Sequence, residues 1–127
     1  MEPKKILIAE DSAVISQLIK FRLEKEGYRV LTAADGVVAL EMAESHTPDV
    51  IVLDVMMPKK DGFTFLQETK ATPALAAIPV IMLSARLLPE DAERARSLGA
   101  YAYLTKPFVA TALLGQIQKA LRERESA

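Results

Sequence analysis

The chain alternates short apolar runs with longer stretches in which apolar residues recur at helical spacing, and this alternation limits the folds it can adopt. The apolar runs have the length of strands and are bounded by Gly, Pro, Asp and other turn-forming residues. They are Ile6–Ala9, Tyr28–Ala33, Val50–Asp54, Val80–Leu83 and Tyr101–Leu104. Five strands alternating with five helices predict a doubly wound α/β fold, with helices on both faces of a parallel sheet. The common five-strand order is 2-1-3-4-5, so we expect the first and third strands to be neighbours.

The predicted helices have identifiable ends and apolar stripes. Ser12 and Asp35 can cap the first two helices, and Gly27 and Gly99 can end the first and fourth. We expect the apolar residues of the first two helices to face the sheet; they are Val14, Ile15, Leu18, Ile19, Leu23, Val37, Val38, Leu40, Met42 and Ala43. Since no repeat or long linker interrupts the pattern, the sequence predicts one domain over residues 1–127.

Composition narrows the class of protein. The 127 residues include 16 Lys and Arg against 17 Asp and Glu, a net charge of −1, which gives no support for a nucleic-acid-binding surface, since such a surface needs a clustered excess of Lys and Arg. The chain has no Cys, which excludes disulfides, thiolate catalysis and sulfur-ligated metals. The first apolar run stops at Glu10, too early for a signal peptide or a membrane span. We therefore expect a cytoplasmic protein that contacts neither nucleic acid nor membrane directly.

Acidic residues follow two of the predicted strands. Glu10 and Asp11 come directly after the first strand, and the third strand ends on Asp54. Taken alone, Asp54 is explained as a turn cap, and the acidic pair as favourable charge at a helix N-terminus. If strands 1 and 3 are neighbours, however, three carboxylates meet at one edge and need a cation unless some are protonated. Oxygen ligands without His or Cys favour Mg²⁺, Mn²⁺ or Ca²⁺ over zinc, and a Mg²⁺ site leaves positions open for a phosphate oxygen.

Two further polar residues follow the last two strands. Ser84 comes after the fourth strand and Lys106 after the fifth. Each alone is common as a cap or as a solvated surface residue. Together, a hydroxyl and an ammonium facing the carboxylates would suit the charge of a phosphoryl group.

These residues resemble those of the receiver domains of two-component response regulators, the chemotaxis-regulator-like phosphoacceptor domains with a flavodoxin-like fold. The resemblance covers essentially the whole chain and rests on Glu10–Asp11, Leu53–Pro58, Asp61–Gly62, Ser84–Ala85 and Tyr103–Phe108. It implies that Asp54 accepts a phosphoryl group from a phosphohistidine on a sensor histidine kinase or phosphotransfer protein. It also implies that Asp11, Asp54 and the backbone carbonyl of Met56 bind Mg²⁺, with Glu10 acting through water.

The resemblance further implies a conformational switch. Lys106 would pair with the phosphoryl oxygens, Ser84 would move to bond one of them, and Tyr103 would turn into the space that Ser84 leaves. The face formed by helix 4, strand 5 and helix 5 would then change toward an output domain, a separate partner protein or a second copy of the chain. The domain would be a phosphoacceptor that assists its own phosphorylation and slow dephosphorylation, and not a turnover enzyme.

Three other functions fit the sequence less well. A nucleotide- or flavin-binding protein of this architecture needs a phosphate-binding loop after the first strand, where Glu10 and Asp11 would repel phosphate. Phosphatases with an aspartyl nucleophile place a second Asp two residues later, where this chain has Met56. A pseudo-receiver that never carries phosphate usually lacks an acid or the Lys, and this chain has both. Whether the domain acts alone or within a longer regulator stays open.

Overall fold

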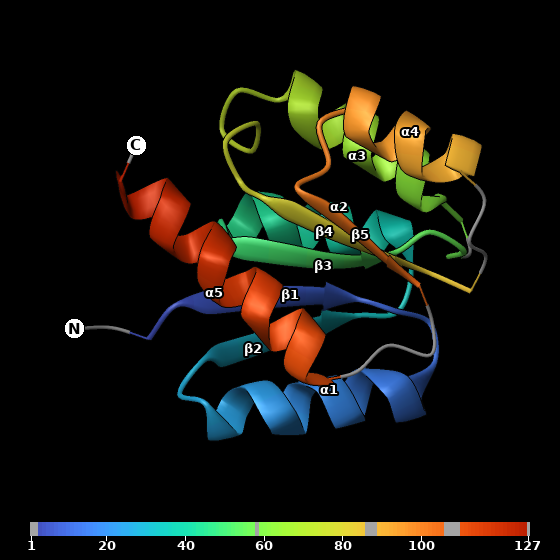
Figure 1. Ribbon diagram of the computed structural model, residues 1–127. Helices are drawn as coiled ribbons and strands as arrows, with labels where there is room; N and C mark the ends of the chain where they lie inside the picture. Colours follow the sequence, from blue (N-terminus) through green and yellow to red (C-terminus); the bar gives the residue numbers. More distant parts are fainter. Residues whose placement is uncertain (1–2, 58, 86–88, 106–109, 127) are drawn as a thin grey trace.

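The computed structural model describes residues 3–57, 59–85, 89–105 and 110–126. Strands and helices alternate along the chain, as the sequence predicts (Figure 1). The strands are β1 (Lys5–Ala9), β2 (Arg29–Ala33), β3 (Val50–Asp54), β4 (Val80–Ser84) and β5 (Ala102–Thr105). The helices are α1 (Ala13–Lys25), α2 (Gly36–His46), α3 (Gly62–Ala71), α4 (Pro89–Ser97) and α5 (Ala110–Ser126).

All strand pairs are parallel, and the strand order is β2-β1-β3-β4-β5. This confirms the predicted fold and places β1 beside β3, with Ala9 opposite Leu53. Successive side chains of a strand point to opposite faces of the sheet, so the sheet supports two separate cores. One core lies under α1 and α5, and the other under α2, α3 and α4 (Figure 1). β1, β3 and β4 are buried almost throughout because helices cover both of their faces.

Polar side chains cap the first three helices. The hydroxyl oxygen of Ser12 accepts a hydrogen bond from the amide of Ile15 at 3.3 Å. A carboxylate oxygen of Asp35 accepts from the amide of Val38 at 2.9 Å, which confirms both predicted caps. Asp61 caps α3 in the same way.

One prediction about the first two helices is wrong in part. On α1, Ile19 and Leu23 are buried against the sheet as expected, but Val14 and Leu18 are 71% and 66% exposed. On α2, the first-turn residues Val37 and Val38 are also partly exposed. The periodicity correctly showed which residues share a side of each helix, but the sheet covers a narrower arc than the apolar residues occupy.

Two smaller features complete the fold. β5 begins one residue later than predicted, and all four of its residues are partly exposed because it is an edge strand. Within the described ranges, no helix has both the length and the apolar character needed to cross a membrane.

Candidate functional site

The three acidic residues meet at the carboxyl edge of the sheet. Glu10 and Asp11 follow β1 and Asp54 ends β3, so the pairing of these two strands brings their side chains together. One carboxylate oxygen from each of the three lies within 4.8 Å of the others. Glu10 and Asp54 are 3% and 4% exposed, whereas Asp11 is open to solvent. The predicted acidic cluster is therefore present, with one member accessible from outside.

Backbone amides orient the two buried acids. The carboxylate of Glu10 accepts a hydrogen bond from the amide of Ser12 at 3.1 Å. The carboxylate of Asp54 accepts one from the amide of Met56 at 3.0 Å. Such bonds restrict the rotation of a carboxylate. Asp54 thus has a defined orientation that depends on the segment directly after β3.

The described residues of that segment, 55–57 and 59–61, lie between the end of β3 and the start of α3. Its first residue, Val55, donates its amide to Leu83 of β4 and accepts a hydrogen bond from the amide of Gly62, both at 2.9 Å. A Cβ atom on Gly62 would lie 2.7 Å from the Cα of Val55 and 3.0 Å from the carbonyl oxygen of Asp54. Only glycine fits this approach, since both neighbours are backbone atoms. We call residues 55–57 and 59–61 the β3–α3 loop.

The hydroxyl predicted to face the acids also lies at this edge. Ser84 ends β4 and is 1% exposed, and β4 pairs with β3 so that Leu83 stands opposite Asp54. Tyr103 of β5 is partly buried and packs against the core under α2, α3 and α4. Lys106 lies outside the described residues, and so does Pro58 of the family motif.

The donor set of the acidic cluster fits a hard divalent cation. Its ligating groups are carboxylates, with no imidazole or thiolate among the described residues of the cluster. Two of the three acids are nearly out of contact with water, which makes their mutual repulsion stronger than it would be in solution. A Mg²⁺ ion matches both the oxygen ligands and the need for positive charge, and Asp11 leaves the site open on one side.

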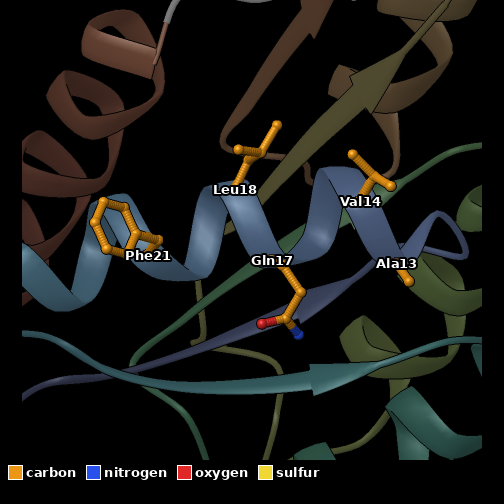
Figure 2. Close-up of a pocket in the computed structure, with 5 residues that line it drawn as sticks. All are labelled: Ala13, Val14, Gln17, Leu18 and Phe21. Carbon is orange, nitrogen blue, oxygen red and sulfur yellow. The ribbon is translucent and has the colours of Figure 1, made fainter.

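Sequence reasoning missed an apolar patch beside this edge. Val14, Leu18 and Phe21 follow one another along α1 and are exposed; together with Ala13 and Gln17 they line a shallow hollow (Figure 2). We call Val14, Leu18 and Phe21 the α1 patch. The signal was available in the sequence, since the apolar residues of α1, with Phe21 included, span too wide an arc for one sheet face to cover. The α1 patch begins at the first turn of the helix that follows Asp11.

Comparisons with known proteins agree with this arrangement. The sequence matches the family model for the response regulator receiver domain over residues 6–118. It is 40% identical over 124 residues to the alkaline phosphatase synthesis transcriptional regulatory protein PhoP of Bacillus subtilis, covering 98% of this chain and 51% of that protein. It is 41% identical over 120 residues to the transcriptional regulatory protein PdtaR of Mycobacterium tuberculosis, covering 94% of this chain and 57% of that protein. The chain thus spans about half the length of these curated relatives.

Solved structures of similar length share the fold. The chemotaxis response regulator CheY4 of Vibrio cholerae superposes with a TM-score of 0.88 at 36% identity, covering 94% of this chain and 99% of that one. The receiver domain of the Francisella response regulator 1452 gives a TM-score of 0.90 at 34% identity, covering 94% and 98%.

Proposed function

This chain belongs to the family of response regulator receiver domains, and we propose that it accepts a phosphoryl group on Asp54 from a phosphohistidine of a sensor kinase or phosphotransfer protein. The observation that carries the proposal is the placement of Asp54. Its carboxylate is nearly buried, is oriented by the Met56 amide, and lies within 4.8 Å of two other acids at the carboxyl edge of the sheet. An aspartate that only caps a turn would not need two other carboxylates so close to it.

The transfer exchanges one bond for another. A carboxylate oxygen of Asp54 forms a bond to phosphorus while the bond between phosphorus and the donor's imidazole nitrogen breaks. The imidazole keeps the bonding electron pair and is left neutral once it holds one proton. The product is an acyl phosphate on Asp54, which serves as a signal and not as an intermediate of rapid turnover. No second Asp stands two residues beyond Asp54 to speed its hydrolysis, so we propose that self-dephosphorylation is slow.

Mg²⁺ would be held by Asp11, Asp54 and the backbone carbonyl of Met56, with Glu10 acting through water. When bound, the ion supplies positive charge that offsets the carboxylates and the incoming phosphoryl oxygens. The acids themselves hold the site open, because their repulsion disfavours collapse of the cluster onto itself.

The remaining family residues would couple phosphorylation to a change of surface. Ser84 is buried beside the site, and we propose that it moves to bond a phosphoryl oxygen while Tyr103 turns inward. Lys106 would pair with the phosphoryl group; this role rests on the family alone. The changed face would consist of α4, β5 and α5.

The partners follow from the site and the relatives. A protein donor that reaches Asp54 would lie against the start of α1, where the α1 patch offers an apolar surface. The signal would pass to an output domain, as suggested by the transcriptional regulators among the relatives, or to a separate protein or second copy, as suggested by the chemotaxis regulator. In either case we treat residues 1–127 as one receiver domain acting in the cytoplasm.

Intact mass spectrometry after incubation with acetyl phosphate and Mg²⁺ tests the proposal. We expect one added phosphoryl group that requires Mg²⁺ and is absent from Asp54→Asn. The matched control is Asp49→Asn, at the opposite end of β3, where the carboxylate accepts a hydrogen bond from the amide of Lys5; this variant should still be phosphorylated. If the wild-type protein gains no phosphate and beryllofluoride leaves its amide NMR spectrum unchanged, the domain is a protein-binding pseudo-receiver and the proposal is wrong.

A further inference from the structure

The β3–α3 loop is held at its far end by the start of α2. Gly36, the first residue of α2, is buried against Lys60. A Cβ atom at position 36 would lie 2.3 Å from the carbonyl oxygen of Lys60 and 2.5 Å from its Cβ. Since non-bonded heavy atoms prefer separations of roughly 3.5 Å, a side chain here would push the loop away by about 1 Å. The contact with Lys60 is therefore the reason that glycine is needed at position 36, since its own backbone conformation is open to other residues.

An ion pair adds to this contact. Asp35, which caps α2 through the amides of Val37 and Val38, has its second carboxylate oxygen 3.7 Å from the ammonium of Lys59. The hydrogen bond from the Val38 amide lowers the pKa of Asp35, and the charge of Lys59 lowers it further. Lys59 is 69% exposed, so this pair alone is worth little. The steric fit at Gly36 is the stronger constraint, and the ion pair supports it.

The loop's near end carries the groups that matter to Asp54. Met56 donates its amide to the Asp54 carboxylate, and Gly62 closes the loop onto Val55. Lys59 has φ of 68°, a left-handed conformation that a lysine adopts only when its surroundings hold it there. Glycine contacts thus hold the loop at Lys60 and at Val55. We therefore expect a displacement at Lys60 to act on the nearby segment that contains Met56.

We propose that Asp35 and Gly36 are positioning residues for the phosphoacceptor site, which hold the β3–α3 loop so that the amide and carbonyl of Met56 are correctly placed at Asp54. This inference rests on the proposed function of Asp54. It assigns a role in the site to the start of α2, an element that contributes no ligand or reacting atom.

The direct test compares Gly36→Ala with Gly115→Ala. Gly115 lies in α5 with open space around its missing Cβ, so it is a matched glycine without a neighbour to displace. Each protein is titrated with Mg²⁺ while its amide NMR spectrum is followed, and its phosphorylation rate by acetyl phosphate is measured well below its melting temperature. A misplacement of about 1 Å at reacting groups can cost about a hundredfold in rate. Since the displacement arises at Lys60 and only part of it would reach Met56, we expect Gly36→Ala to lose about tenfold in Mg²⁺ affinity and in rate. Gly115→Ala should match the wild type in both.

A second pair of variants covers the case in which Gly36→Ala does not fold. Lys60→Gly removes atoms from the contact and leaves the loop looser, while Glu68→Gln removes only the ion pair that Lys60 forms with α3. We expect Mg²⁺ affinity to fall in Lys60→Gly and to stay unchanged in Glu68→Gln.

The readouts separate this inference from the proposed function. Absence of phosphate on the wild-type protein would refute the phosphoacceptor, but the Met56 amide resonance would still report the loop in metal-free protein. A shift of that resonance in Gly36→Ala, and not in Gly115→Ala, supports the positioning role. Unchanged Met56 resonance, Mg²⁺ affinity and phosphorylation rate in folded Gly36→Ala would overturn it, and so would equal losses in the two alanine variants.

Discussion

Replacing Asp54 with Asn is expected to raise the free energy of unfolding of the metal-free protein, because the fold holds this charge close to two others. Asn has nearly the same volume as Asp, and its side-chain oxygen can still accept the hydrogen bond from the Met56 amide. The substitution therefore removes charge while leaving packing and hydrogen bonding almost unchanged. Of the three pairwise repulsions among Glu10, Asp11 and Asp54, it removes two.

The size of the effect follows from the separation of the carboxylates. At the 4.8 Å limit between their oxygens, two unit charges repel by about 0.9 kcal/mol in bulk water and by about 3.5 kcal/mol at an effective dielectric constant of about 20. The pair with exposed Asp11 belongs near the lower value. Other charges near the site reduce the repulsion between Asp54 and buried Glu10. We expect a net gain of about 1–2 kcal/mol, or about 4–8 °C in melting temperature for a domain of this size.

Urea unfolding at neutral pH in EDTA and low salt, followed by circular dichroism, measures this gain. Mg²⁺ should then stabilise the wild-type protein, since a ligand that binds only the folded state adds RT ln(1 + [L]/Kd), and should stabilise Asp54→Asn much less. The control Asp49→Asn removes one carboxylate outside the acidic cluster. It should not gain stability without metal, and Mg²⁺ should stabilise it as much as the wild type. A loss of stability in Asp54→Asn without metal, or equal stabilisation of both proteins by Mg²⁺, would refute the electrostatic reasoning.

Three further results are expected. Gly62→Ala forces a Cβ against the backbone at the end of β3, so it should lower the free energy of unfolding in urea by about 1–3 kcal/mol. Gly115→Ala places its Cβ in open space and should raise that free energy by about 0.5–1 kcal/mol. Equal effects of the two substitutions would contradict the contact at Gly62. Burial, and then the hydrogen bond to Glu123, raise the pKa of Tyr101 to about 12, so its contribution to stability is present below pH 10 and is lost toward pH 12. In an NMR titration of the tyrosine rings, Glu123→Gln should lower this pKa. The pKa of Asp35 is lowered in the folded protein, so this residue adds stability above its ordinary pKa of 3.8, and that stability is lost as the pH falls through the pKa of the folded state. In Asp35→Ala, the free energy of unfolding should therefore depend less on pH in the acid range.

Local signals in the sequence were enough to predict the architecture. Capping side chains at Ser12 and Asp35 and the glycines after two helices act within a few residues of their own positions, so they can be read without knowledge of the fold. Gly27 and Gly99 indeed adopt φ of 93° and 97°, which few other residues tolerate. The apolar residues of α1 span a wide arc in the sequence, but the arc alone does not say that Val14 and Leu18 are the exposed ones, because that depends on how much of α1 the sheet covers.

The candidate site also has one part that the sequence predicts and one part that it does not. Glu10, Asp11 and Asp54 were predictable as a cluster because each lies at the end of a strand, and the strand order alone brings them together. The contact of Gly36 with Lys60 joins positions that no pattern relates, and it appears only when α2 is packed beside α3. Sequence reasoning thus found the three acidic residues and missed the contact that Gly36 makes with the loop after Asp54.

The distribution of burial across the sheet suits the conformational change that we propose. Asp54 and Ser84 end β3 and β4, two strands whose residues are all buried. Helices cover both faces of these strands, so their backbones resist displacement even though the acids at their edge repel one another. Tyr103, by contrast, lies on β5, an edge strand partly exposed at every position. Segments with little buried contact open at the lowest free energy. A phosphoryl group on Asp54 would therefore be attached to a rigid site, and the conformational change that we propose would take place at β5, where the sheet is easiest to rearrange.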